Sequence, residues 1–105
     1  MVNLYRRGRI AERKVANLLE RRGFTNIRRS AGSRGPADLY ARKEGIKYYV
    51  QVKSGSARVS RYEVHRLKTL ARKRRGVALV AHYSDGKVRY RFYGNWSPKR
   101  RKDSQ

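Results

Sequence analysis

The sequence predicts a single α/β domain, a five-stranded mixed sheet flanked by helices, in the order helix, three strands, helix, two strands. Three observations support this fold class. The chain has 105 residues, enough for one domain and too few for two. Helical periodicity covers residues 4–22 and 60–75. Short alternating or apolar runs, typical of strands, occupy the intervals between and after them.

The first predicted helix, residues 4–22, has one apolar stripe. At about 100° per residue the stripe contains Leu4, Gly8, Ala11, Val15, Leu18 and Leu19. Gly23 supplies a stop. Glu12 lies at the edge of the stripe, so we expect it to face the margin of the sheet, whereas Glu20 lies farther round and is expected in solvent.

Three strands are predicted to follow, at residues 24–30, 37–43 and 46–53, with a Gly- and Ser-rich loop at 31–36 and a turn at Glu44-Gly45. The third strand alternates strictly. We therefore expect two opposite faces, one with Ile46, Tyr48, Val50 and Val52, the other with Lys47, Tyr49, Gln51 and Lys53.

Ser60 and Glu63 form a capping box at the start of the second helix, residues 60–75, and Gly76 ends it. Two further strands, at 77–83 and 87–93, are joined by the hairpin signal Asp85-Gly86. We expect residues 1–96 to form one domain and the basic residues 97–105 to be a disordered tail.

Charge restricts the partners of this protein. Lysine and arginine number 29 against 7 acids, a formal net charge of +22, which favours a polyanionic partner. On charge alone, a non-catalytic ribosomal or architectural protein fits as well as an enzyme. The absence of cysteine excludes disulfides, thiolate metal sites and cysteine nucleophiles. With no signal peptide and no membrane span visible, we expect a cytoplasmic protein.

The Glu44-Gly45 hairpin brings candidate catalytic residues together. If the turn is symmetric, paired residue numbers sum to 89, and Asp38 then lies opposite Gln51 with Cβ atoms within about 5.5 Å. Lys53 projects from the same face two residues further on. A carboxylate, an amide oxygen and an ammonium group would then converge at one end of the hairpin.

This set suits metal-assisted phosphodiester hydrolysis. Mg²⁺ prefers oxygen ligands, which Asp38, Gln51 and the main-chain carbonyl of Val52 can provide. Lys53 can hold the attacking water and stabilise charge on the phosphate. Glu12 could bind a second metal or a metal-bound water.

Each residue also has a structural interpretation. Asp38 could cap the loop after Pro36, and Gln51 with Lys53 could be the solvated face of an edge strand. We assign Glu63 to helix capping alone. The joint pattern of Glu12, Asp38, Gln51 and Lys53 favours a catalytic site over these alternatives.

The pattern resembles the nuclease core shared by many restriction enzymes and recombination nucleases. More narrowly, residues 4–83 resemble the archaeal Holliday junction resolvases, cellular or viral. The segments that carry the resemblance are Tyr5-Arg6-Arg7-Gly8, Ala11-Glu12-Arg13, Arg29-Ser30-Ala31-Gly32-Ser33, Ala37-Asp38-Leu39 and Gln51-Val52-Lys53.

The resemblance implies a restriction-endonuclease-like homodimer that binds four-way DNA junctions by shape and makes two symmetric cuts with Mg²⁺ or Mn²⁺. By position, the family's catalytic residues match Glu12, Asp38, Gln51 and Lys53, together with a loop serine for which Ser33 and Ser30 are candidates. The arginines expected near phosphates are Arg6, Arg7, Arg29 and Arg34.

One position departs from the family, whose members usually carry Glu where this chain has Gln51. A neutral amide binds a hard cation more weakly, so we expect Gln51→Glu to keep or raise activity at low Mg²⁺. Two alternatives stay open. One is a related nuclease acting on other branched or damaged DNA, and the other is a non-catalytic basic nucleic-acid-binding protein.

Overall fold

The computed structural model describes the backbone of residues 4–30 and 35–93 and the side chains of residues 8–30 and 35–93. The predicted tail at 97–105 lies outside the described residues. The elements are α1 (Leu4–Arg21), β1 (Thr25–Arg29), β2 (Leu39–Lys43), β3 (Ile46–Ser54), α2 (Arg61–Lys73), β4 (Val77–Ser84) and β5 (Lys87–Tyr93). This order confirms the predicted one. No helix within the described part of the chain is long and apolar enough to cross a membrane.

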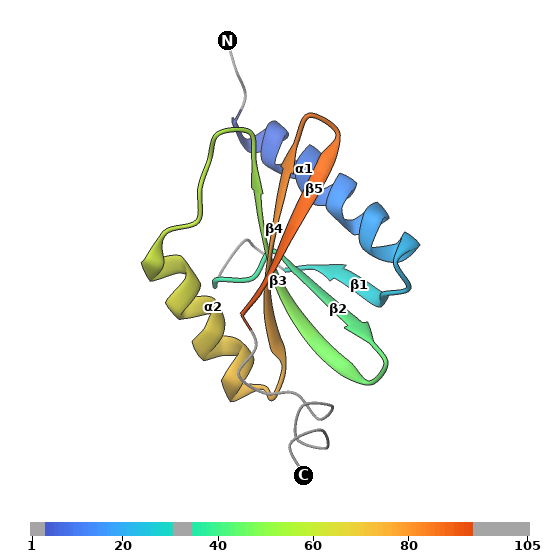
Figure 1. Ribbon diagram of the computed structural model, residues 1–105, viewed down its shortest axis with the longest axis vertical. Coiled ribbons are helices and arrows are strands. Elements are labelled where there is room, and N and C mark those ends of the chain that lie inside the picture. The colour runs from blue at the N-terminus through green and yellow to red at the C-terminus, as the bar shows by residue number, and fades with distance from the viewer. Residues whose placement is uncertain (1–3, 31–34, 94–105) are drawn as a thin grey trace.

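The five strands form one mixed sheet in the order β1-β2-β3-β4-β5, with α1 and α2 on opposite sides of it (Figure 1). β3 and β4 are parallel, and every other neighbouring pair is antiparallel. The predicted five-stranded mixed sheet is confirmed. β3 is its central strand, so the interpretation of Gln51 and Lys53 as the solvated face of an edge strand is wrong.

Helix α1 covers one face through its apolar stripe. Ala11, Val15 and Leu19 are buried, as the periodicity predicts. The core on this side comprises Val15, Leu19, Phe24, Leu39, Ala41, Val50, Leu79 and Ala81. Tyr48 and Val52 pack against it, so Tyr48, Val50 and Val52 share this face of β3 as predicted.

Helix α2 covers the opposite face with a smaller core of Ala37, Tyr49, Leu67, Ala71, Ala78 and Val80. Ser60 is the N-cap, and the predicted capping box is present. The helix ends at Lys73, before the predicted Arg75, and Arg75 adopts a positive φ of 57°. Gly76 is required for a different reason, because a Cβ there would lie 2.7 Å from the carbonyl oxygen of Lys47.

Both hairpins turn through two residues with positive φ, Glu44 and Gly45 in one and Asp85 and Gly86 in the other. Such turns match the twist of the flanking strands and set the register. Pairing in the first hairpin runs from Lys43↔Ile46 to Leu39↔Val50, so the predicted sum of 89 is confirmed over these residues. The first two strands are shorter than predicted, and β1 contains an irregularity between Thr25 and Arg28.

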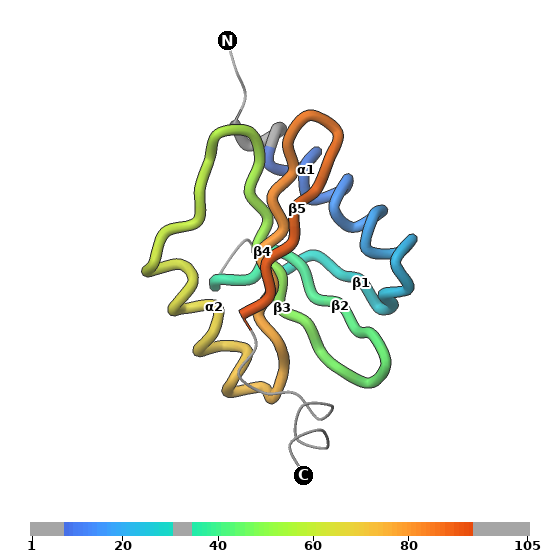
Figure 2. The backbone as a smooth tube through the Cα atoms, in the orientation of Figure 1, coloured from blue at the N-terminus to red at the C-terminus, as the bar shows by residue number. Residues whose placement is uncertain are grey.

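The link between β3 and α2 runs along the α2 side of the molecule (Figure 2). It is tied to β4, because the Gly55 amide donates to the Tyr83 carbonyl over 3.0 Å and Nε2 of His82 lies 2.7 Å from the Gly55 carbonyl oxygen. The His82 ring therefore helps to hold the link against β4. The link brings the first turn of α2 close to the end of β3.

Candidate active site

Asp38 lies where the regular pairing of β2 with β3 stops. Its amide donates to the Val50 carbonyl over 2.7 Å, and its Oδ2 accepts a hydrogen bond from the Val52 amide over 2.8 Å. The predicted direct pairing of Asp38 with Gln51 is therefore replaced by a side-chain-to-backbone bond. This bond still holds the carboxylate at the end of the hairpin, beside the residues predicted to act with it.

The pKa of the Asp38 carboxyl is raised above its ordinary value because burial penalises the charged form. The hydrogen bond from Val52 lowers this pKa and the charge of Glu12 raises it, while Lys53 and Glu63 act more weakly. A desolvated carboxylate of this kind is stabilised in its charged form by an additional nearby cation.

Gln51 is only 8% exposed and follows Tyr49 on the α2 face of β3. Its Nε2 donates to Oε2 of Glu63 over 3.1 Å. Its Oε1 is buried and has no hydrogen-bond partner within the part of the chain that the structure describes. An unpaired buried acceptor costs about 1–3 kcal/mol, so this oxygen fits a site that a cation would complete.

Lys53 and Glu63 form an ion pair in which Nζ and Oε2 are 2.7 Å apart. The hydrogen bond from Lys53 is the main cause that lowers the pKa of Glu63 to about 2. The other oxygen, Oε1, accepts the Ser60 amide over 2.8 Å, and the Glu63 amide donates to Oγ of Ser60 over 3.1 Å.

Assigning Glu63 to helix capping alone was therefore wrong. The capping box is confirmed, but it occupies only one carboxylate oxygen, and the second binds both Lys53 and Gln51. No local pattern in the sequence predicts this contact, because the partners are ten or more residues apart. Helix α2, which contains Glu63, is the next element after β3, but the link between them leaves the position of its first turn open.

Glu12 lies on α1 and forms an ion pair with Arg29 of β1, with 3.0 Å between Oε1 and Nε. Its side chain is 18% exposed, which agrees with the expected place at the sheet margin. Glu12 lies within electrostatic range of Asp38, since its charge raises the pKa of that carboxyl. Arg29, expected near phosphates, remains 45% exposed.

The remaining predicted residues are placed only in part. Ser30 is buried, and its amide donates to the Asp38 carbonyl over 2.9 Å, which ties the end of β1 to the site. The Val52 amide donates a hydrogen bond to Asp38, and Val52 pairs with Ala81 of β4. The side chains of Arg6, Arg7, Ser33 and Arg34 lie outside the described residues.

The donor set is short of carboxylates. Among the described side chains, no three His, Cys, Asp or Glu residues are grouped as metal ligands. Mg²⁺ does not require such a group, because it commonly uses one or two carboxylates with waters and substrate phosphate. Asp38, the free oxygen of Gln51 and a main-chain carbonyl fit that pattern.

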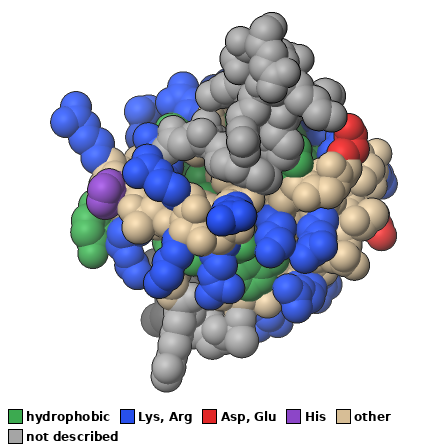
Figure 3. All heavy atoms as spheres, turned by 90° about the horizontal axis from the view of Figure 1, so that it is seen from below, with side chains coloured by type: hydrophobic (Ala, Val, Ile, Leu, Met, Phe, Trp, Pro, Cys, Tyr) green, Lys and Arg blue, Asp and Glu red, His purple; other side chains and the backbone are tan. Residues whose placement is uncertain are grey.

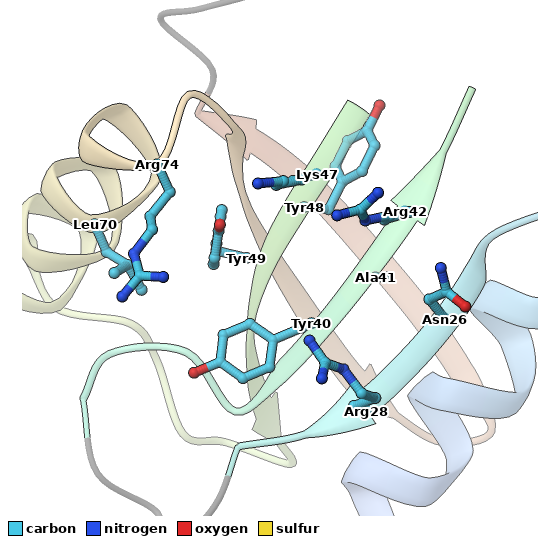
Figure 4. A pocket seen from close by; sticks show the side chains of 10 residues that line it. All are labelled: Asn26, Arg28, Tyr40, Ala41, Arg42, Lys47, Tyr48, Tyr49, Leu70 and Arg74. Atoms are coloured by element: carbon cyan, nitrogen blue, oxygen red, sulfur yellow. The ribbon is translucent and has the colours of Figure 1, made fainter. Parts of the chain in front are cut away.

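A basic pocket of about 610 Å³ is lined by residues of β1, β2, β3 and α2 (Figure 4). Its cations are Arg28, Arg42, Lys47 and Arg74. Tyr40 and Tyr49 line it with rings 5.7 Å apart in a T-shaped contact. Lys and Arg side chains also spread over most of the face in Figure 3, where acidic ones appear only near an edge.

Comparison with known proteins identifies the family of this chain. The family model of the archaeal Holliday junction resolvases matches residues 3–102. Among solved structures, Hjc from the archaeal hyperthermophile Archaeoglobus fulgidus, a Holliday junction resolvase, is 30% identical with a TM-score of 0.62, covering 78% of this chain and 71% of that one. No curated protein matches the chain significantly. The chain belongs to the archaeal Holliday junction resolvase family and has its restriction-endonuclease-like fold.

Proposed function

We propose that this member of the family is a Mg²⁺-dependent endonuclease that resolves four-way DNA junctions by paired symmetric cuts, acting as a homodimer. The observation that carries the proposal is the unpaired, buried Oε1 of Gln51. This oxygen comes from the part of β3 that also carries Lys53 and whose Val52 amide holds the desolvated Asp38 carboxylate.

Asp38, the amide oxygen of Gln51 and the Val52 carbonyl would hold the metal. Mg²⁺, or Mn²⁺ in its place, supplies a Lewis acid that polarises the scissile phosphate and neutralises developing charge. Asp38 contributes the one negative ligand, and its burial keeps water from screening the interaction. Glu12 lies close enough to influence this charge and is the candidate for a second contact to the hydrated ion.

Lys53 is the group that can donate hydrogen bonds to the attacking water or to a non-bridging phosphate oxygen. A fixed cation at that point stabilises the extra negative charge of the transition state. A loop serine, Ser33 or Ser30, would add a hydrogen bond to the phosphate. Arg6, Arg7, Arg29 and Arg34 would neutralise neighbouring phosphates, in keeping with the net charge of +22.

The homodimer follows from the substrate. A junction is resolved only when two strands are cut, and one domain of this size carries one such site. Two copies related by two-fold symmetry would present two equivalent sites to a junction with matching symmetry. Light scattering at micromolar concentration is expected to give twice the mass of the chain, and a monomer in both the presence and the absence of junction would contradict the paired-cut model.

The decisive experiment is cleavage of an end-labelled four-way junction, with and without Mg²⁺, by the wild type and by Asp38→Ala. We expect paired symmetric cuts that require metal and vanish in the variant, with junction binding retained. Flaps and linear duplex of the same sequences test the substrate preference. Tight binding without cutting under Mg²⁺ or Mn²⁺ would support the non-catalytic alternative.

A further inference from the structure

We propose that Glu63 is a positioning residue of the active site and forms a matched pair with Gln51, in which the carboxylate on α2 orients the amide on β3 and holds Lys53. The inference rests on the proposed function, because that function assigns Gln51 and Lys53 their roles in cleavage. Nothing in the family resemblance pointed to Glu63.

The first step is that the Glu63 carboxylate is fixed in place. Oε1 accepts the Ser60 amide over 2.8 Å, and Oε2 accepts both Nζ of Lys53 over 2.7 Å and Nε2 of Gln51 over 3.1 Å. Rotation of the carboxylate would break three hydrogen bonds at once. The helix cap therefore serves as a rigid anchor for two side chains of β3.

The second step concerns the orientation of the Gln51 amide. An ionised carboxylate only accepts hydrogen bonds, so the atom of Gln51 that faces Glu63 must be its NH₂ group. The amide oxygen is thereby turned away from Glu63, and this is the buried oxygen without a partner. Glu63 thus selects, of the two possible amide orientations, the one that leaves an oxygen free for a cation.

The third step explains the departure of this chain from its family. A glutamate at position 51 would place a second carboxylate about 3 Å from that of Glu63, where like charges repel and both compete for Lys53. The neutral Gln51 avoids this repulsion. The earlier expectation that Gln51→Glu keeps or raises activity treated position 51 alone, and the contact with Glu63 predicts the opposite.

The test uses four variants of the full chain. Glu63→Gln removes the charge but keeps a residue that can complete a capping box. Glu20→Gln is the matched control, the same substitution at an exposed position of α1. Gln51→Glu creates the like-charge contact, and the double variant Gln51→Glu with Glu63→Gln exchanges the two groups between the strand and the helix.

Three readouts are needed. Single-turnover cleavage at saturating junction gives the rate, and titration of each metal-free protein with Mn²⁺, followed by electron paramagnetic resonance, gives metal affinity without any turnover. Nuclear magnetic resonance of the metal-free wild type reports whether the Gln51 side-chain amide protons are protected from exchange and contact the Glu63 side chain. This last measurement does not depend on the folding of any variant.

We expect Glu63→Gln to lower both cleavage rate and Mn²⁺ affinity by about 10–100-fold, as is typical for residues that orient metal ligands, with junction affinity unchanged. Glu20→Gln should match the wild type. Gln51→Glu alone should cut more slowly than the wild type. The double variant should recover most of the activity, because the new amide can donate to the new carboxylate, and a merely structural role for Glu63 gives no such rescue.

Wild-type cleavage and wild-type Mn²⁺ affinity in Glu63→Gln would overturn the proposal, as would a freely exchanging Gln51 amide or losses that simply add in the double variant. These outcomes differ from failure of the proposed function. If no protein cuts any junction, but Mn²⁺ affinity and the Gln51 signal respond to Glu63 as expected, the positioning role stands and the nuclease assignment fails.

Discussion

The two faces of β3 are built from alternate residues of one strand, but one face is apolar core and the other carries the polar residues of the proposed site. On the α1 face, Val50 is fully buried, with Tyr48 and Val52 beside it in an apolar core. On the α2 face, exposed Lys47 is followed by buried Tyr49, and the face then becomes polar at Gln51 and Lys53. The polar part meets the first turn of α2 through Glu63.

The difference shows how a small domain separates folding from chemistry. Helix α1 extends over 18 residues and covers its face of the sheet with an apolar stripe. Helix α2 begins after the link that follows β3, so its first turn lies near the end of that strand. The end of β3 on the α2 side is therefore covered by a helix start with its charged side chains. The apolar face holds the strand in register, and the opposite face can then carry groups that would be costly in a core.

Salt is expected to have the largest effect and to separate DNA contacts from the contacts that hold the fold. Junction affinity should fall by about a thousandfold or more between 50 and 200 mM salt, as for proteins that neutralise six or more phosphates. The melting temperature should rise over the same range, because salt screens the self-repulsion of a +22 chain. Filter binding and thermal melts measure the two responses, and a flat binding curve would contradict phosphate-dominated recognition.

Asp38→Asn should break the polar face alone. Its amide oxygen can still accept the Val52 hydrogen bond, but the negative metal ligand is lost, so we expect cleavage to slow by about a thousandfold. Burial raises the pKa of Asp38 because it destabilises the charged carboxylate. The neutral variant should therefore melt at the same temperature as the wild type or higher. Glu20→Gln is again the control, and unchanged cleavage in Asp38→Asn would exclude Asp38 as a ligand.

Leu19→Ala should break the apolar face alone. Leu19 is fully buried on α1, away from the residues of the proposed site, and its truncation should lower the free energy of unfolding by about 2–5 kcal/mol. Urea denaturation measures this loss. At a temperature where the variant remains folded, its cleavage rate should equal that of the wild type, and a slower rate there would show that the two faces are coupled.

The pH dependence of stability should show the smallest effect. The folded pKa of Glu63, about 2, lies below its ordinary value of 4.5, so the stability that its charge contributes is fully present above 4.5 and is lost as the pH falls through 2. With solvent screening at this partly exposed pair, we expect Glu63→Gln to cost about 1 kcal/mol at neutral pH. Denaturation at several pH values tests this, since the difference from the wild type must shrink as the pH falls from 4.5 through 2.

Much of the fold was predictable because local signals agreed with one another. The two-residue turn at Glu44-Gly45 set the register of the first hairpin, and the capping box located the start of α2. The alternation of the third strand correctly separated the face of Val50 from that of Gln51. Boundaries shifted where tertiary contacts intervened, as at Phe24, which leaves the predicted strand and joins the core.

The candidate site was predictable only in its members on the strands. The period of two places Gln51 and Lys53 on one face of β3. The register of the hairpin predicts the approximate position of Asp38, although regular pairing stops beside it, at Leu39↔Val50. The bond from Asp38 to the Val52 amide was not predictable, because it replaces the regular ladder where the strands separate. The contacts of Glu63 with Lys53 and Gln51 were not predictable, because the capping box already accounts for an acid at that position.

By itself, the sequence determined the order of the elements, the two faces of β3 and the chemical types gathered at its end, since these depend on local periodicity and turn geometry. Only the tertiary structure decided that β3 lies at the centre of the sheet and that one carboxylate both caps α2 and binds Lys53 and Gln51. Those features depend on how elements that are ten or more residues apart in the sequence pack against each other, and no local pattern encodes that packing.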